Sequence, residues 1–233
     1  MQPVTGLDYD LLKYMLEDAK GEFFLPFLAA AVVAYLCGCF NGSVIVSKYI
    51  LRDDVRTHGS GNAGLTNFHR TFGGPLTAVV ILTDVLKAVA ALSAGVAIFG
   101  TLFTPESGML LFAKYWGALF CLLGHMFPCM FGFKGGKGIL SGGAVALMVD
   151  WRIALVVWGG FLLLVILTKY VSLGSTWAGT SFPFATWFCF PDQPLVIILG
   201  FLCGALVVWQ HRANIKRLLN GTENKFSLHR KKT

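Results

Sequence analysis

Residues 59–70 have the composition of a phosphate-binding loop. The segment reads GSGNAGLTNFHR and has three glycines in its first six residues. Glycine lets successive backbone N–H groups converge on an anion, and the serine, threonine and asparagine side chains add donors. The expected phosphate-binding residues are Ser60, Gly61, Asn62, Gly64, Thr66, Asn67 and Arg70. A tight turn with helix-capping side chains is the alternative interpretation.

A second glycine-rich segment adds two ammonium groups. Residues 132–138 read GFKGGKG, and Lys137 is followed by glycine, so the nucleotide-binding P-loop pattern is absent. The candidate binding residues are Lys134, Gly135, Gly136, Lys137 and Gly138. Two anion-binding segments in one chain predict two phosphorylated molecules and a reaction between them. Lysines that only anchor the chain at a membrane edge are the alternative.

Two further polar segments, residues 168–175 and 211–217, adjoin apolar runs. Their candidate side chains are Ser172, Ser175, His211 and Asn214. The serines either line the site or cap a helix. His211 and Asn214 are three residues apart and would share one face of a helix. A basic membrane-proximal helix explains the Arg and Lys of that segment but not this pair.

Two ionisable residues, Asp84 and Lys87, lie inside an apolar run with the same three-residue spacing. An unpaired ionised group costs about 2.5–3.5 kcal/mol at the centre of a membrane helix. The spacing therefore predicts a structural ion pair that lines the site rather than a catalytic pair. His125 lies beside the second glycine segment, but an isolated histidine near a helix end is typical of structural hydrogen bonding, so we assign it no role in the chemistry.

The composition shows that membrane helices must position these segments. Of 233 residues, 55% are hydrophobic and 13% are charged, which excludes an ordinary soluble domain. A helix that spans a bilayer needs about 20 predominantly apolar residues. Apolar runs occur at residues 23–50, 74–103, 109–130, 139–149, 153–167, 175–190 and 194–210. We therefore expect a single all-α, polytopic domain.

The stretch 139–167 is either one long helix or two short helices that meet near Asp150 and Arg152. Two helices give seven spans and place fourteen basic residues on one side: Lys48, Arg52, Arg56, Arg70, Lys134, Lys137, Lys169, Arg212, Lys216, Arg217, Lys225, Arg230, Lys231 and Lys232. Four remain on the other side: Lys13, Lys20, Lys114 and Arg152. Cytoplasmic loops carry the excess of Lys and Arg, so seven spans with the N-terminus outside and the C-terminus in the cytoplasm are favoured.

This topology divides the chain into three parts. Residues 1–22 form an acidic extracytoplasmic segment that lacks signal-peptide character, residues 23–210 the seven-span catalytic domain, and residues 211–233 a basic cytoplasmic tail. The run 139–149 measures only about 16 Å, too short for about 30 Å of hydrocarbon. Short helices beside glycine loops indicate a polar pocket that opens to the cytoplasm and receives a soluble phosphate ester together with a lipid chain.

The remaining composition argues against metal, cofactor and nucleic-acid sites. The six cysteines lie in or beside apolar runs without a Cys-x-x-Cys pair, which is typical of buried thiols. The net charge of +7 comes from basic residues that flank apolar runs, so it reflects membrane topology rather than nucleic-acid binding. We expect no metal and no cofactor.

Taken in order, the segments at 59–70, 84–87, 124–138, 168–175 and 211–223 closely resemble the bacterial acyl-phosphate:glycerol-3-phosphate acyltransferase family. The resemblance implies a seven-helix bundle in the inner membrane with a cytoplasmic-facing site. It also implies transfer of a fatty acyl group from acyl phosphate to the sn-1 hydroxyl of glycerol 3-phosphate, the first step of phospholipid synthesis. Lysophosphatidic acid and inorganic phosphate would be the products. The substrates and the bilayer are the implied partners, and docking of an acyl-phosphate-producing enzyme is left open.

The resemblance also implies roles for individual residues. The serine and arginine of the first segment, here Ser60 and Arg70, are needed for activity in that family. The glycine-lysine loop, here residues 134–138, binds glycerol 3-phosphate. The C-terminal segment provides two residues that support activity and one structural glutamate, in order His211, Asn214 and Glu223.

The His-x4-Asp motif of other acyltransferases is absent, because no histidine of this chain is followed five positions later by aspartate. An acyl phosphate is a mixed anhydride with a good leaving group, so orientation and charge neutralisation suffice for catalysis. We hypothesise direct attack by the acceptor hydroxyl while Ser60, the backbone N–H groups of residues 61–64 and Arg70 hold the departing phosphate.

A transporter of an organic phosphate or an anionic lipid is the competing interpretation, because it would also need basic, glycine-lined cavities at broken helices. Two features argue against it. The chain has no internal repeat, and its polar segments gather at one face of the membrane rather than at the midplane.

Overall fold

The structure is a computed structural model that describes residues 24–103 and 108–226. Every regular element in these residues is helical, which confirms the predicted all-α class. The helices are α2 (Phe24–Cys39), α3 (Gly42–Ile45), α4 (Leu65–Thr71), α5 (Leu76–Phe99), α6 (Met109–Met126), α7 (Ile139–Val149), α8 (Trp151–Thr168), α9 (Val171–Cys189), α10 (Pro194–Gln210) and α11 (Arg212–Leu219). Shorter helical turns occur at Val46–Ile50, Val55–Thr57 and Cys129–Phe131. The predicted acidic segment 1–22 lies outside the described residues.

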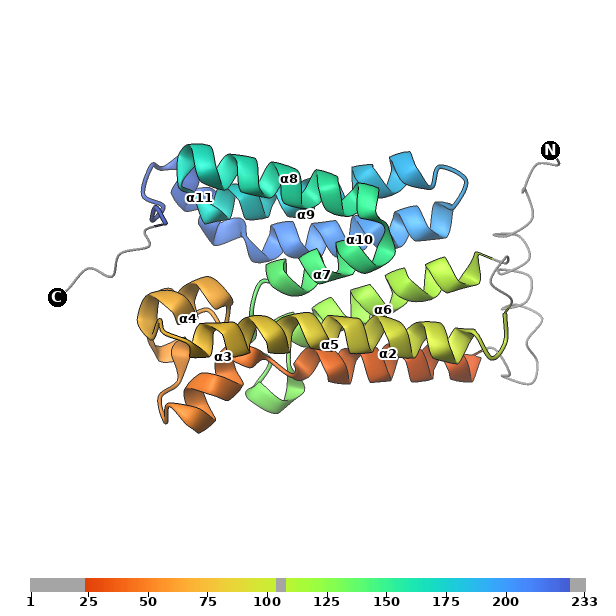
Figure 1. The fold of residues 1–233 in the computed structure, drawn as a ribbon, viewed down its shortest axis with the longest axis horizontal. Coiled ribbons are helices and arrows are strands. Elements are labelled where there is room, and N and C mark those ends of the chain that lie inside the picture. The colour runs from red at the N-terminus through yellow and green to blue at the C-terminus, as the bar shows by residue number, and fades with distance from the viewer. Residues whose placement is uncertain (1–23, 104–107, 227–233) are drawn as a thin grey trace.

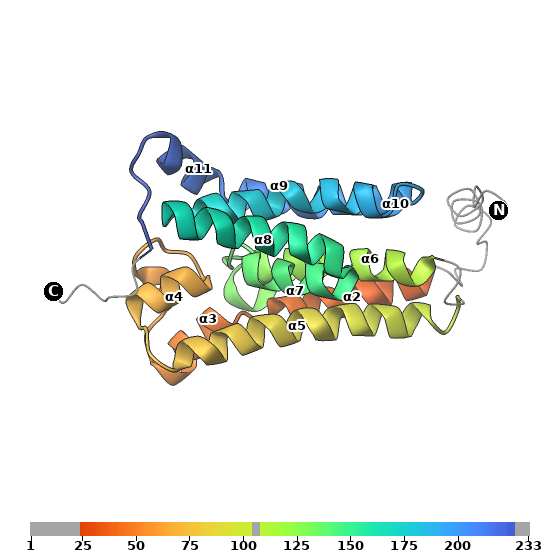
Figure 2. The same ribbon diagram turned by 45° about the horizontal axis from the view of Figure 1, so that its top comes forward.

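The longer helices form a bundle along the long axis of the molecule (Figure 1). Helices α2, α5 and α6 pack against one another on one side, and α8, α9 and α10 form the other side. The short helix α7 lies between the two groups and contacts both α5 and α8. Helices α3, α4 and α11 gather at one end of the bundle in both views (Figures 1 and 2). That end carries most of the polar segments identified above.

Each of the seven predicted apolar runs overlaps one of the helices α2 and α5 to α10 in the described residues. Helices α5 and α8, and α6 with the turn after it, are each long and apolar enough to cross a membrane. Two bent pairs add a span each if counted as one element: Phe24–Cys39 with Gly42–Ile50, and Pro194–Gln210 with Arg212–Leu219. Helix α7 has only 11 residues and is shorter than a bilayer requires. The chain is thus an all-α, multi-pass membrane protein.

The boundary between α7 and α8 confirms the predicted split of residues 139–167. Asp150 ends α7 and caps α8, since its carboxylate accepts a hydrogen bond of 2.7 Å from the backbone N–H of Arg152. The same carboxylate forms a 3.0 Å ion pair with the Arg152 guanidinium. A capping carboxylate at this position explains why two helices form instead of one.

The first apolar run, predicted as continuous over 23–50, is interrupted at Asn41. The side-chain oxygen of Asn41 caps α3 by accepting from Val44 N at 3.1 Å, and its amide donates to the carbonyl of Ala63 at 3.1 Å. Helix α3 and the following turn therefore bend 41° away from α2. The bend connects the end of the first span to the glycine segment of residues 59–70.

Glycines bring α2 and α6 into backbone contact. A Cβ at Gly38 would lie 2.2 Å from the carbonyl oxygen of Cys121, and one at Gly124 would lie 2.1 Å from that of Tyr35. Small residues at helix crossings allow such close approach in membranes. The contact fixes the C-terminal end of α6, which precedes the second glycine segment in the chain.

Candidate functional site

One pocket of about 700 Å³ lies among the first glycine segment, the second glycine segment and helices α8, α9 and α11. It brings most of the predicted site residues together: Ser60, Asn62, Gly64, Thr66, Asn67, Arg70, Asp84, Lys137, Gly138, Ser172, Ser175, His211, Asn214 and Glu223. Other predicted residues do not line it: Gly61, Lys87, Lys134, Gly135 and Gly136. Four segments that are far apart in the sequence thus share one cavity.

Asn67 organises the first glycine segment. Its side-chain oxygen accepts from the backbone N–H of Ser60 at 3.0 Å, and its amide nitrogen donates to the carbonyls of Val55 and His58, each at 3.0 Å, and of Asn62 at 3.1 Å. The backbone turns tightly at Gly59, where φ is +56° and a Cβ would lie 2.3 Å from the Asn67 oxygen. The polar groups of Asn67 are therefore engaged by the loop itself.

Ser60 and Arg70 lie on either side of this organised turn, and both are exposed at the pocket. The backbone N–H of Ser60 donates to the Asn67 side chain, which fixes the backbone of Ser60 in the loop. The Arg70 guanidinium donates to the carbonyl of Asn224 at 3.4 Å. Arg70 therefore contacts the chain after α11, so the first glycine segment and the C-terminal segment meet at the pocket.

The second glycine segment folds back on the end of α6. The backbone N–H of Gly135 donates to the carbonyl of Met126 at 3.1 Å, and that of Gly136 donates to the carbonyl of His125 at 3.0 Å. Gly136 is buried, and a Cβ there would lie 2.2 Å from His125 Nε2 and 2.8 Å from the carbonyl oxygen of Ala63. The α-carbon of Gly136 thus lies where the two glycine segments touch.

The two lysines of this segment have different positions. Lys134 is exposed, and its carbonyl accepts from Arg56 at 3.3 Å on the outer side of the loop. Lys137 lines the pocket, and its ammonium donates to the side-chain oxygen of Asn214. Burial, with a smaller contribution from the charge of Arg217, lowers the pKa of Lys137 to about 8. Lys137 is therefore the cation of this loop that faces the pocket.

Glu223 orients Asn214. One carboxylate oxygen accepts from the Asn214 amide nitrogen at 3.0 Å, and the other accepts from Arg217 Nε at 2.7 Å. Because the amide nitrogen of Asn214 faces Glu223, its oxygen faces Lys137. Arg217 also lines the pocket, although sequence reasoning attributed it to membrane topology alone.

His211 lies at the 57° bend between α10 and α11 and is 3% exposed. Its Nδ1 is 2.8 Å from the carbonyl oxygen of Val207. A carbonyl only accepts hydrogen bonds, so Nδ1 carries the proton and Nε2 is an acceptor. The bend at the end of α10 thus presents a histidine with a fixed tautomer to the pocket.

The two α9 serines that line the pocket differ in their partners. Ser175 Oγ donates back to the carbonyl of Val171 at 2.9 Å within the helix. Ser172 Oγ is buried and has no hydrogen-bond partner among the residues that the structure describes. A buried hydroxyl without a partner is costly unless a ligand or water satisfies it. Of the two serines at the pocket, Ser172 is therefore the one whose hydroxyl is available to a bound molecule.

The predicted ion pair between Asp84 and Lys87 is present, with Lys87 Nζ 2.7 Å from Asp84 Oδ1 in the buried interior. Sequence reasoning missed its third member. His125 Nδ1 lies 2.6 Å from the same ammonium, and the His125 side chain lines the pocket together with Asp84. In the sequence, the only sign that His125 belongs to the site is its position close to the second glycine segment.

One wall of the pocket is apolar. Trp158, Phe161 and Val165 of α8 line it, together with Val171 of α9 and Ile139 of α7. Helix α8 is otherwise little buried, with 17% of its residues inside the protein, so this wall adjoins the membrane-facing surface. The pocket therefore combines polar groups and hydrocarbon in the way that an amphiphile requires.

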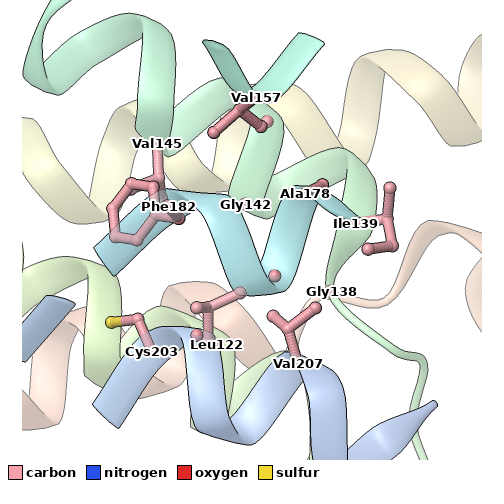
Figure 3. Close-up of a pocket in the computed structure, with 13 residues that line it drawn as sticks. Leu122, Gly138, Ile139, Gly142, Val145, Val157, Ala178, Phe182, Cys203 and Val207 are labelled. Atoms are coloured by element: carbon pink, nitrogen blue, oxygen red, sulfur yellow. The ribbon is translucent and has the colours of Figure 1, made fainter. Parts of the chain in front are cut away.

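A second, smaller cavity of about 30 Å³ adjoins the pocket at Gly138 and Ile139 (Figure 3). Leu122, Val145 and Phe182 are among its apolar lining residues. By this measure one water molecule needs about 10–15 Å³, so the cavity is too small for a hydrocarbon chain. The apolar wall of the large pocket therefore offers more room for a hydrocarbon chain than this cavity does.

A sequence model of the glycerol-3-phosphate acyltransferase family matches residues 28–221. Among relatives, a glycerol-3-phosphate acyltransferase of Clostridioides difficile is 40% identical over 199 residues, covering 85% of this chain and 95% of its own. One of Thermoanaerobacter pseudethanolicus is 37% identical over 195 residues, with coverages of 84% and 93%.

Solved structures agree with these relatives. The crystal structure of PlsY (YgiH), an integral membrane glycerol 3-phosphate acyltransferase, in its glycerol 3-phosphate form superposes with a TM-score of 0.73 at 33% identity, covering 86% of this chain and 96% of that one. Its lysophosphatidic acid form gives a TM-score of 0.71 at the same identity, with coverages of 86% and 95%. Sequence and fold agree along nearly the whole length, and the chain belongs to the glycerol-3-phosphate acyltransferase family of integral membrane enzymes.

Proposed function

We propose that this protein transfers a fatty acyl group from acyl phosphate to the sn-1 hydroxyl of glycerol 3-phosphate, giving lysophosphatidic acid and inorganic phosphate. The observation that supports this most is the single pocket in which the first glycine segment, Lys137 and the apolar wall of α8 meet. A phosphorylated acceptor and a lipid-chain donor need such a combination. The relatives named for glycerol 3-phosphate, and the neighbour in its lysophosphatidic acid form, support the acceptor and the product.

The donor phosphate is assigned to the first glycine segment. Ser60, the backbone N–H groups of residues 61–64 and Arg70 neutralise the charge that builds up as phosphate departs. Asn67 keeps this loop in shape through its four hydrogen bonds to the loop. The acyl chain lies against Trp158 and Phe161 on the membrane side. No protein nucleophile takes part, because the anhydride is already activated.

The acceptor phosphate is assigned to Lys137 and the glycine loop. Asn214 holds the ammonium toward the pocket, and Glu223 orients Asn214. The sn-1 hydroxyl attacks the acyl carbonyl, and a phosphate oxygen of the substrate takes the proton. His211 Nε2 and Ser172 Oγ, an acceptor and a donor respectively, orient the glycerol hydroxyls. No cofactor is required.

The proposed setting is the inner membrane of a bacterium, with the N-terminus outside and the tail after residue 210 in the cytoplasm. Residues 52–70 and α11 lie at the same end of the bundle, so both would face the cytoplasm (Figure 2). An enzyme that produces acyl phosphate would dock on this side. The charge distribution of the sequence supports this orientation.

The test is turnover by purified protein in detergent. With acyl phosphate and glycerol 3-phosphate and no gradient, we expect release of inorganic phosphate with equimolar lysophosphatidic acid, above a control of detergent alone. A transporter of an organic phosphate or anionic lipid would show no release. A second assay supplies acyl-CoA instead of acyl phosphate and tests the identity of the donor. Comparable turnover with acyl-CoA would contradict the proposal that acyl phosphate is the specific donor.

A further inference from the structure

His125 joins the buried ion pair to the second glycine segment. The residue is 3% exposed and lies at the end of α6. Its Nδ1 is 2.6 Å from Lys87 Nζ. Its Nε2 faces the α-carbon of Gly136, at 2.2 Å from the position that a Cβ would take. One imidazole therefore contacts a membrane-embedded cation on one side and the loop that carries Lys137 on the other.

The contacts of Lys87 define the protonation of this ring. Its ammonium donates to Asp84 Oδ1 at 2.7 Å and to the carbonyl of Phe40 at 3.1 Å, which leaves one proton for His125. An ammonium has three donors and no acceptor, so His125 Nδ1 accepts and the ring is neutral with its proton on Nε2. Asp84 also accepts from the backbone N–H of Gly42 at 3.4 Å. The ring is thus fixed by α3 and α5 as well as by its own helix.

The loop depends on His125 through two contacts. The carbonyl of His125 accepts from the backbone N–H of Gly136 at 3.0 Å, and the ring packs against the Gly136 α-carbon. Gly136 also abuts the carbonyl of Ala63 in the first glycine segment. The next residue is Lys137. A change in the ring would therefore move the backbone immediately before the pocket-facing ammonium.

We propose that His125 is a positioning residue for the acceptor. Held by Asp84 and Lys87, it fixes Gly136 and so directs the Lys137 ammonium at the phosphate of glycerol 3-phosphate. The inference rests on the proposed function, in which Lys137 binds that phosphate. The buried Asp84–Lys87 pair then has a role besides stability, because it fixes the orientation of the His125 ring. The ring in turn fixes the backbone of the second glycine segment.

Two substitutions of His125 test its two contacts separately, the one with Lys87 and the one with Gly136. In His125→Asn the side-chain oxygen takes the place of Nδ1, so Lys87 keeps its acceptor while the space beside Gly136 empties. In His125→Gln the amide reaches the place of Nε2, so the loop contact returns while Lys87 loses its third acceptor. We expect His125→Asn to raise KM for glycerol 3-phosphate about tenfold with little change in Tm. We expect His125→Gln to lower Tm while KM stays within about threefold of wild type.

A double-mutant cycle tests whether His125 acts through Lys137. If it does, His125→Asn should change KM for glycerol 3-phosphate by less than about twofold in a Lys137→Ala background. The KM for acyl phosphate should stay within about twofold in all variants. His58→Asn is the matched control, because His58 pairs with exposed Asp53 and does not line the pocket.

Several outcomes would overturn the inference. One is a KM that His125→Asn leaves unchanged while His125→Gln raises it. Another is an equal rise for both substrates, and a third is the full effect persisting without Lys137. Each would make His125 a purely structural residue. Absence of turnover by wild-type protein would instead contradict the proposed function, so the two failures are distinguishable.

Discussion

The ammonium of Lys137 donates a hydrogen bond to the side-chain oxygen of Asn214, although the two residues are 77 positions apart. This contact joins the second glycine segment to helix α11. Glu223 holds the Asn214 amide in the orientation that makes the contact possible. The second glycine segment and the C-terminal segment therefore form one unit, and under the proposed function a change in either should alter binding of the same substrate.

Asn214→Asp should weaken glycerol 3-phosphate binding more than Asn214→Ala. A carboxylate would pair with Lys137 and compete with the substrate phosphate, whereas alanine only removes an acceptor. We expect KM for glycerol 3-phosphate to rise about tenfold or more for the aspartate variant and less for the alanine variant. Asn220→Asp, an exposed change at the end of α11, is the control. Alanine as harmful as aspartate would contradict the assignment.

Activity should decline above about pH 8 because of Lys137. Burial lowers the pKa of this ammonium to about 8, so the group is charged below that pH and neutral above it. Since kcat/KM reports the free enzyme, its value for glycerol 3-phosphate should fall by up to about tenfold per pH unit beyond that point.

Lys137→Arg provides the control for this pH dependence, because guanidinium stays charged across the same range. Its profile should be flat above about pH 8 even if its absolute activity is lower. Initial rates at each pH, corrected for spontaneous acyl phosphate hydrolysis, give both curves. The same decline in wild type and in the arginine variant would mean that another group titrates.

Gly136→Ala should lower the catalytic efficiency with both substrates. The added methyl would lie 2.2 Å from His125 Nε2 and 2.8 Å from the Ala63 carbonyl, so it would separate the two glycine segments. We expect kcat/KM to fall by about 100-fold or more for acyl phosphate and for glycerol 3-phosphate. Gly159→Ala is the matched control, because nothing lies within 4 Å of a Cβ there. A loss confined to glycerol 3-phosphate would show that the first segment moves independently.

Ser60→Ala and Arg70→Lys should lower kcat with acyl phosphate. Loss of one donor to a developing charge costs about 2.7–4 kcal/mol in other enzymes, and lysine lacks the planar fork that binds two phosphate oxygens. Arg52→Lys, at an exposed residue outside the pocket, controls for the loss of a guanidinium. Wild-type rates in both variants would reject the site. An acyl group trapped on Ser60 by acyl phosphate alone, detected by mass spectrometry, would reject direct transfer.

The proposed orientation of the chain predicts which introduced cysteines react with membrane-impermeant thiol reagents from each side of the membrane. Cysteines introduced one at a time at Arg52 and Asn220, in a variant without native cysteines, should react in inside-out vesicles and stay protected in intact cells. Arg52 lies between α3 and α4 in the sequence and Asn220 follows α11 directly, and these three helices gather at one end of the bundle (Figure 1). Labelling of either in intact cells would invert the proposed topology.

Much of the architecture was predictable because it depends on local properties. The run 194–210 coincides with α10, and the capping carboxylate of Asp150 divides α7 from α8 as the charge distribution required. The joining of the polar segments in one pocket followed from their common membrane edge. These features need only hydrophobic length, charge and turn composition, which the sequence states directly.

Contacts between distant segments were not predictable. Lys134 and Lys137 look equivalent in the sequence, but the hydrogen bonds of Gly135 and Gly136 to α6 turn one lysine outward and the other into the pocket. Asn67 was expected to contact substrate, yet its polar groups hold its own loop. His125 gains its partner Lys87 from another helix, 38 residues away. Such roles depend on tertiary geometry rather than on residue type.

The apolar wall of α8 has a kinetic consequence. In the proposed arrangement the donor reaches Trp158 and Phe161 by lateral diffusion within one leaflet, while glycerol 3-phosphate arrives by three-dimensional diffusion from the aqueous phase. Saturation by the donor would then follow its mole fraction in the bilayer, and saturation by the acceptor its bulk molarity. The rate of the enzyme would thus depend on the composition of the membrane that it helps to build as well as on the concentration of glycerol 3-phosphate in the water.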